Sequence, residues 1–136
     1  MPWKLSTEFT FDSAHTIEGY DGPCGRLHGH TYRVRLELTA ERLRPSAHIR
    51  RSIMVADFRS LKWAKKDVSE GGLDHMYLND HPELGQDTTA EVIAAYIWRE
   101  TMRRVRATLE EGDDGDDLRL RVLLWETPES CCEYWE

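Results

Sequence analysis

The chain has 136 residues, of which 40% are hydrophobic, a composition typical of one soluble domain, which we place at residues 1–136. The formal charge is −7, and the absence of a basic stripe or arm argues against nucleic-acid binding. No apolar run is long enough to cross a membrane, and the N-terminus lacks a signal-peptide stretch, so we expect a cytoplasmic protein. Three cysteines, two of them adjacent, predict reduced thiols rather than disulfides.

Two segments that alternate between apolar and polar residues predict two long strands. Residues 3–15 carry apolar side chains on one face and end with His15 on that face. Residues 28–39 repeat the pattern. His28 and His30 begin their apolar face, because side chains on a strand point the same way every second residue. The modest loop between the segments favours antiparallel pairing.

The middle of the chain predicts a short third strand and a helix. Residues 40–50 are expected to form a connection that Pro45 interrupts, and residues 53–56 a short strand. Asp57 is predicted to cap a helix that ends at Gly71–Gly72. The apolar side of this helix is expected to include Phe58, Leu61, Ala64 and Val68.

A second helix is predicted before an acidic segment. Thr88 and Glu91 have capping-box spacing, with Thr88 as the N-cap of a helix that runs to about Leu109. Residues 110–117 hold six carboxylates, without which the net charge would be near −1. We interpret this segment as a solvated, flexible loop.

The end of the chain completes the predicted fold. Residues 118–126 alternate and predict a strand, and residues 131–135 add an edge segment. Neighbouring strands with short connections favour an α+β fold, in which an antiparallel sheet carries the helices on one face.

Three histidines are candidate metal ligands. His15, His28 and His30 share the apolar face near strand ends and converge if the strands pair. Three imidazoles can hold zinc and leave one coordination position open, as in a catalytic site. The alternative is that one or more are core histidines held by backbone hydrogen bonds. The spacing on two neighbouring strands favours zinc.

Four further residues could carry chemistry. Cys24 lies in a Gly/Pro-rich loop before His28 and is either a reactive thiolate or an incidental thiol. Asp74 and His75 could supply a carboxylate and a general base, or be ordinary surface residues. Glu126 extends an apolar strand face, where it either reaches water or binds the N–H groups of a heterocycle.

Taken together, these residues resemble the 6-pyruvoyl-tetrahydropterin synthase superfamily, whose bacterial branch includes the 6-carboxy-tetrahydropterin synthases of queuosine biosynthesis. The similarity spans nearly the whole chain, and the spacing from the cysteine to His-Gly-His resembles the 6-carboxy branch. The similar segments are Phe11–His15, Cys24–His30, Val55–Phe58 with Leu61–Lys62, Leu73–His75, Leu78–Asp80, Thr89 with Glu91, Tyr96–Trp98 and Glu126–Thr127.

The resemblance implies a tunnelling fold (T-fold), with a four-stranded antiparallel sheet and two helices on one face. Such subunits form trimers that close a β-barrel, and two trimers stack into a homohexamer with active sites between subunits. The implied activity is that of a zinc-dependent lyase. It would convert 7,8-dihydroneopterin triphosphate into 6-carboxy-5,6,7,8-tetrahydropterin, with loss of triphosphate and acetaldehyde. The implied Zn²⁺ ligands are His15, His28 and His30, the implied proton-handling residues are Cys24, Asp74 and His75, and the implied pterin contacts are Glu126 and Thr89.

Some features depart from the family, and other functions stay open. Ala90 stands where relatives often have a second hydroxyl residue, and the tail at 130–135 and the acidic loop are unusual. One alternative is a 6-pyruvoyl-tetrahydropterin synthase acting on the same substrate. Another is a three-histidine zinc hydratase or hydrolase that does not need Cys24, and a third is a non-catalytic metal-binding barrel.

Overall fold

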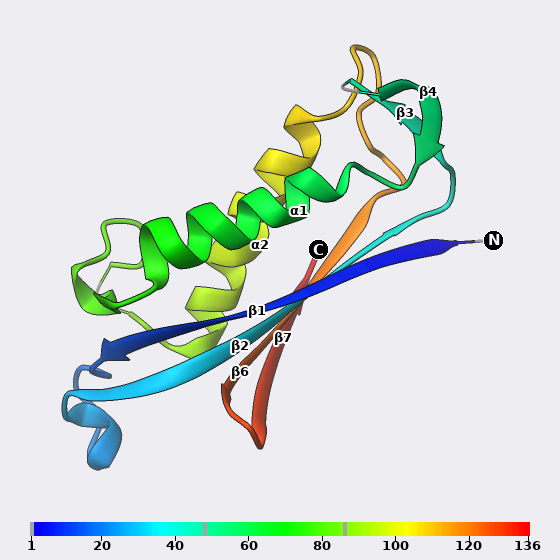
Figure 1. The fold of residues 1–136 in the computed structure, drawn as a ribbon. Helices are drawn as coiled ribbons and strands as arrows, with labels where there is room; N and C mark the ends of the chain where they lie inside the picture. The colour runs from blue at the N-terminus through cyan, green and yellow to red at the C-terminus, as the bar shows by residue number, and fades with distance from the viewer. Residues whose placement is uncertain (1, 48, 86) are drawn as a thin grey trace.

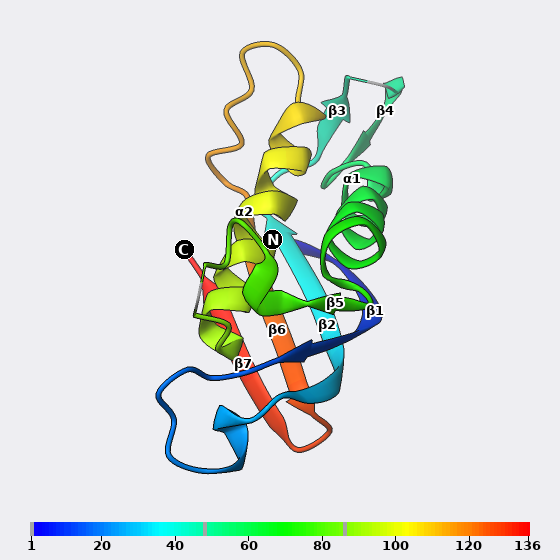
Figure 2. The same ribbon diagram turned by 90° about the vertical axis from the view of Figure 1, so that its left-hand side faces the viewer.

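The fold is a twisted sheet with helices packed on one face (Figures 1 and 2). The computed structural model describes residues 2–47, 49–85 and 87–136. The main sheet has the strand order β5-β1-β2-β6-β7, and a second sheet pairs β3 with β4. The strands are β1 (Trp3–His15), β2 (His28–Ala40), β3 (Arg44–Ser46), β4 (Ile49–Met54), β5 (Met76–Tyr77), β6 (Arg119–Thr127) and β7 (Ser130–Trp135).

Two long helical segments cover the same face of the main sheet, as Figure 1 shows. The predicted α+β class, with four antiparallel strands and two helices, is confirmed. The short β5, parallel to β1, is an addition that the alternation did not predict. The helical segments are η1 (Pro23–Gly25), α1 (Phe58–Ala64), η2 (Lys65–Leu73, π-helical and continuous with α1), η3 (Leu78–Asp80) and α2 (Ala90–Ala107).

The two strands predicted from alternation pair antiparallel along their whole length, ending with His15 opposite His28. Their inner face is buried, and the rings of Phe11 and Tyr32 stack there with centroids 4.7 Å apart. A slip of one residue would turn this apolar set to solvent, so burial fixes the register. The register in turn fixes which side chains meet at the strand ends.

The helices bury apolar stripes against this face. Leu61 and Val68 contribute from α1 and η2, and Ile93 and Ile97 from α2. The buried indole of Trp98 donates a hydrogen bond of 2.9 Å to a β6 carbonyl, which satisfies its polar atom. In the described ranges, no helix has the length and apolar character that spanning a membrane requires.

The first helix begins as predicted but differs in two details. Asp57 is its N-cap and accepts a hydrogen bond of 2.9 Å from the Arg59 amide. Phe58, predicted to face inward, is 48% exposed at the first helical position. Gly71–Gly72 do not end the helix, because η2 continues through them to the buried Leu73.

The second helix begins one residue later than predicted. Thr89, not Thr88, is its N-cap and accepts a hydrogen bond of 3.4 Å from the Val92 amide. Thr88 is buried instead, and its hydroxyl donates to the Thr16 carbonyl at 3.2 Å. Because Val92 then occupies the third helical position, Glu91 is out of place for the predicted capping box.

The segment predicted as a connection at 40–50 contains part of a β-hairpin. β3 pairs with β4 in the separate two-stranded sheet, so the strand predicted at 53–56 begins earlier and ends at Met54. Pro45 is tolerated, because a two-stranded sheet leaves one edge of each strand free of ladder bonds.

The acidic segment 110–117 is fastened by two arginines and is not simply a solvated loop. Arg42 lies 3.2 Å from Asp113 and 3.3 Å from Asp117. The buried Arg44 also contacts both carboxylates. Burial alone would raise the pKa of Asp117, but hydrogen bonds from the Arg42 amide and the Arg44 guanidinium lower it to about 2. The loop therefore anchors the β3–β4 hairpin.

Replacing Asp117 by asparagine is expected to lower the free energy of unfolding by about 1–3 kcal/mol at neutral pH, because the buried Arg44 loses one of its two carboxylate partners and keeps only the longer contact with Asp113. The folded pKa lies below the unfolded value of about 3.9, so this contribution is present above about pH 4 and disappears toward pH 2. Urea unfolding at several pH values measures the effect. The control is Asp114→Asn, the same charge change at an exposed position of the loop. Equal losses in both variants would contradict the arginine anchor.

Candidate functional site

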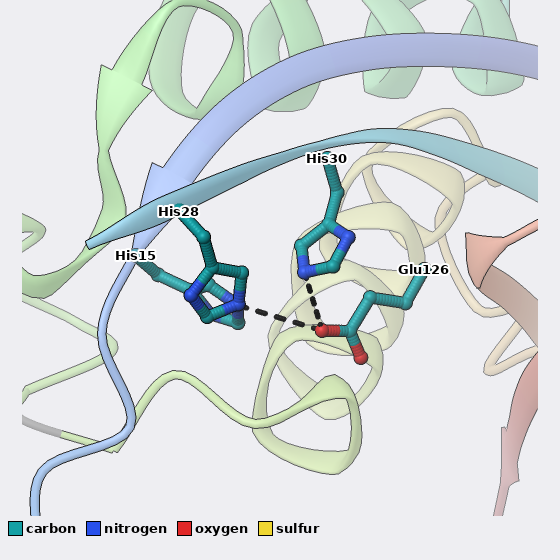
Figure 3. A group of neighbouring side chains, drawn as sticks. All are labelled: His15, His28, His30 and Glu126. Atoms are coloured by element: carbon teal, nitrogen blue, oxygen red, sulfur yellow. Dashed lines mark ion pairs between the residues drawn. The ribbon is translucent and has the colours of Figure 1, made fainter. Parts of the chain in front are cut away.

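Three imidazoles meet on the inner face of the sheet where β1 ends and β2 begins (Figure 3). His15 stands opposite His28, and His30 follows on the same face. The ring centroids are 4.6 Å apart for His15 and His28, 5.2 Å for His15 and His30, and 4.9 Å for His28 and His30. The structure therefore brings together the three histidines that the alternation singled out.

Backbone carbonyls orient two of these rings. Nδ1 of His15 lies 2.9 Å from the Thr88 carbonyl oxygen, and Nδ1 of His28 lies 2.7 Å from that of Arg26. A carbonyl only accepts, so each Nδ1 donates and each neutral ring keeps its lone pair on Nε2. The backbone bonds expected of core histidines are present, yet they leave the second nitrogen available. This arrangement is typical of histidines that bind metals.

A carboxylate from β6 completes the cluster. Oε1 of Glu126 lies 2.9 Å from Nε2 of His30 and 3.4 Å from Nε2 of His15 (Figure 3). It reaches them because the pairing of β6 with β2 stops at Trp125 opposite Arg33. Contact with the His15 ring lowers the pKa of Glu126, and burial lowers the pKa of His30. At neutral pH the carboxylate is therefore ionised and the His30 ring neutral.

The donor set of this cluster fits a divalent metal ion. Each of the four side chains offers one ligand atom, and these atoms all lie within 4.8 Å of one another. Nε2 of His15 and Nε2 of His30 are buried and have no hydrogen-bond partner. Imidazole nitrogen and carboxylate oxygen are common zinc ligands, so the three histidines and Glu126 could hold zinc.

A second group of polar side chains surrounds the tight turn after η2. Oδ1 of Asp74 accepts a hydrogen bond of 2.9 Å from the Asp12 amide, and Nδ1 of His75 lies 2.9 Å from Oδ2 of Asp74. The hydrogen bond from the Asp12 amide is the main cause of the lowered pKa of Asp74. The hydrogen bond between His75 and Asp74 raises the pKa of His75. The exposed His75 has a positive φ of 57°, in the left-handed region of the backbone. The adjacent side chains Asp74 and His75 thus act as a pair.

The predicted catalytic residues are not assembled within one chain. Asp12 lies beside the Asp74–His75 pair. It is three residues before His15 on β1, so its side chain points to the side of the sheet opposite the histidines. Cys24 is exposed in η1 and belongs to neither polar group. The structure therefore separates the metal-type cluster, the Asp74–His75 pair and Cys24.

Some site residues carried weak sequence signals. Thr88 fixes the tautomer of His15 through its carbonyl, which no side-chain pattern predicts. Thr31 donates to the Asp12 carboxylate, and their positions opposite each other on the polar faces of β1 and β2 could have indicated this contact. Thr89 was singled out, but in the structure its hydroxyl caps α2.

Open space lies on both sides of His30. One cavity of about 610 Å³ is lined by His30 and Glu126 together with Arg33 and Trp125. Another of about 610 Å³ is lined by His30, Asp12 and His75 among others. Arg33, Trp125 and Asp12 belong to the face of the sheet opposite the histidines, so both hollows open mainly on that face and include only His30 and Glu126 from the cluster. Cys24 lines neither cavity.

The fold and this site define an α+β protein with a three-histidine, one-carboxylate cluster at the ends of paired strands. A sequence profile described as 6-pyruvoyl tetrahydropterin synthase matches residues 4–136, so the chain belongs to the 6-pyruvoyl tetrahydropterin synthase family.

Relatives and solved structures agree with this family. The chain is 31% identical to the 6-carboxy-5,6,7,8-tetrahydropterin synthase of Haemophilus influenzae, over 98% of this chain and 99% of that protein. It is 38% identical to the enzyme of the same name from Synechocystis, over 71% and 72% of the two chains. The structure of Caenorhabditis elegans 6-pyruvoyl tetrahydropterin synthase superposes with a TM-score of 0.73 at 23% identity, covering 100% of this chain and 96% of that one. This last likeness shows a shared fold.

Asp74→Asn is expected to return the pKa of His75 toward its ordinary value of about 6.5, because the charge that favours the imidazolium is removed. Titration of the His75 ring protons by NMR in metal-free protein measures this pKa. Asp80→Asn, the same charge change at an exposed position nearby, is expected to leave it raised. If both variants titrate like the wild type, the Asp74–His75 pair does not operate in solution.

Proposed function

We propose that this chain is a cytoplasmic zinc-dependent lyase. It would convert 7,8-dihydroneopterin triphosphate into 6-carboxy-5,6,7,8-tetrahydropterin, with loss of triphosphate and acetaldehyde, as a step of queuosine biosynthesis. The observation that carries the proposal is the cluster of three histidines and Glu126 beside an open cavity. The names of the relatives at 31% and 38% identity support the 6-carboxy product.

The proposed zinc ligands are His15, His28 and His30. Backbone carbonyls already hold two of these rings with Nε2 available, so little reorganisation is needed on metal binding. When bound, zinc supplies Lewis-acid chemistry that orients and polarises the side-chain oxygens of the substrate.

The proposed pterin contacts are Glu126 and Thr89. A carboxylate can accept two N–H groups from the amidine-like edge of a pterin, and Glu126 lines a cavity large enough for a bicyclic ring. The Thr89 oxygen accepts from the Val92 amide, so its O–H remains able to donate to the ring.

The phosphate chain needs a local cation, because the net charge of −7 gives no general attraction for it. Arg33 lines the same cavity as Glu126, and its guanidinium lies 4.0 Å from the centre of the Trp125 ring. Arg35 is held by Glu8 at 2.6 Å, whereas Arg33 has no carboxylate at ion-pair distance within the described ranges. Arg33 alternates with His30 along β2, however, so it lies on the opposite face of the sheet and is not placed to bind the phosphate chain of a pterin held at the histidine cluster of the same chain.

The separation of the predicted catalytic residues supports an active site shared between subunits. We propose that the Cys24 thiolate takes a proton from the substrate carbon, while Asp74 and His75 of a second copy complete the proton path. β1 pairs with β5 only at its end, so most of its edge is free for a strand of another copy, as in a trimeric barrel. Two such trimers would form a homohexamer. The exposed apolar residues Tyr20, Leu27, Met76 and Tyr77 belong to the loop between β1 and β2 and to β5.

A 6-pyruvoyl-tetrahydropterin synthase is the second candidate, and the description of the matching family profile favours it. It would use the same substrate and the same cluster. The two candidates differ in the mass of the pterin that leaves the enzyme.

Purified protein incubated with dihydroneopterin triphosphate is expected to yield 6-carboxy-tetrahydropterin by mass spectrometry. Cys24→Ala should lower turnover by about 100-fold or more while the zinc content stays unchanged, because the thiol moves protons and is not a ligand. The control is Cys131→Ala, which removes another exposed thiol. Unchanged substrate in the presence of bound zinc would exclude the lyase, and an active Cys24→Ala variant would favour a hydrolase.

Mixing two inactive variants tests the shared site. Chains carrying Cys24→Ala and chains carrying His75→Ala, refolded together in equal amounts, should recover about one quarter of wild-type activity. In that fraction of sites, the Cys24 of a His75→Ala chain meets the His75 of a Cys24→Ala chain. Each variant refolded alone is the control. No recovery in mixed hexamers would place Cys24 and His75 of one site on the same chain.

A further inference from the structure

Asp12 lies on β1 but contacts the turn that carries the Asp74–His75 pair, and its side chain lies on the face of the sheet opposite His15. We infer that Asp12 is a positioning residue for the proposed proton path. Its main chain holds the turn in place, and its carboxylate is the second anion beside the His75 ring. The contacts are features of this chain alone, whereas their use in catalysis rests on the proposed function.

The main chain of Asp12 contacts both residues of the pair. The Asp12 amide donates a hydrogen bond of 2.9 Å to Oδ1 of Asp74, and the Asp12 carbonyl accepts one of 2.6 Å from the His75 amide. His75 has a φ of 57°, which a non-glycine residue rarely adopts, so the surrounding contacts must hold it there. The next residue on β1, Ser13, accepts a hydrogen bond of 3.3 Å from the Met76 amide and so extends this attachment beyond the pair.

The carboxylate of Asp12 lies beside the same pair. Thr31, opposite Asp12 on β2, donates a hydrogen bond to its Oδ1. One carboxylate oxygen of Asp12, one of Asp74 and a ring nitrogen of His75 all lie within 4.8 Å of one another. Two carboxylates at this separation repel each other unless a cation lies beside them. His75 is the member of the group that can supply this positive charge, so the arrangement favours its imidazolium form.

Asp74 and Asp12 act on the ring with unequal strength. The hydrogen bond to Asp74 is the main cause of the raised pKa of His75, and the negative charge of Asp12 adds a smaller contribution in the same direction. Within the described ranges, these two carboxylates are the charged groups that act on the ring. The ring is exposed in the isolated chain, where water and salt screen both contributions. A second copy that covers this end of the chain would strengthen them.

In the proposed shared site, β1 of each chain serves two active sites. One face of β1 supplies His15 to the cluster of its own chain. The opposite face, through Asp12, supports the His75 ring that reaches Cys24 of a second copy. A nearby imidazolium favours the thiolate form of a cysteine. Asp12 would thus act on Cys24 only through His75, without touching the substrate.

Asp12→Asn removes the charge and keeps the main-chain contacts, because asparagine has nearly the same shape and the position is exposed. Titration of the His75 ring protons by NMR in metal-free protein is expected to show a lower pKa than in wild type, with a smaller change than Asp74→Asn causes. The control is Glu8→Gln, which removes a charge from the same face of β1 about 13 Å away along the strand. It should leave the pKa of His75 unchanged.

The pH dependence of kcat/KM tests the role in catalysis. If activity requires the thiolate and the imidazolium together, the alkaline limb of this profile reports the loss of the His75 proton. In Asp12→Asn this limb should move to lower pH while the zinc content stays unchanged. Asp12→Glu, which keeps the charge, should hold the limb near its wild-type position.

An unchanged pKa of His75 in Asp12→Asn, with the fold verified by circular dichroism, would overturn the inference. A loss of activity that is equal at every pH would also overturn it, because Asp12 would then be a structural support alone. If the His75 titration behaves as expected but wild-type protein converts no dihydroneopterin triphosphate, the proposed function fails and the electrostatic link between Asp12 and His75 remains.

Discussion

The whole site depends on the register between β1 and β2. Because the inner faces of both strands are buried, the pairing cannot slip by one residue without exposing rings such as Phe11 and Tyr32. The same register sets His15 opposite His28, with His30 two residues further along. Hydrophobic burial far from the strand ends therefore positions imidazoles that could not hold one another in place.

Electrostatics at this point of the fold favours a bound cation over a closed hydrogen-bond network. The N–H groups of His15 and His28 already donate to the carbonyls of Thr88 and Arg26. Glu126 adds a negative charge where the remaining nitrogen lone pairs of these rings converge. In a metal-free chain such a cluster is destabilising, since buried polar atoms stay unsatisfied. The long antiparallel pairing of β1 with β2 holds these polar atoms together despite that cost.

The alternation of apolar and polar residues was enough to predict the strands and the convergence of the histidines, because a two-residue period identifies the side chains that share a face. It failed where contacts join distant segments. Arg42 and Arg44 meet Asp113 and Asp117 across about 70 residues, and nothing within the acidic segment indicates these partners. The separation of Cys24 from the other predicted catalytic residues could not be predicted either, since the spacing of residues along the chain does not say which side chains meet in space.

Zinc K-edge X-ray absorption on the purified protein tests the central claim most directly. The account predicts one zinc per chain, with nitrogen or oxygen ligands at about 2.0–2.1 Å and outer-shell scattering from three imidazole rings. Scattering from a single imidazole would instead place the ion at the Asp12, Asp74 and His75 group on the other side of the sheet. That result, or a protein that takes up no zinc, would contradict the account.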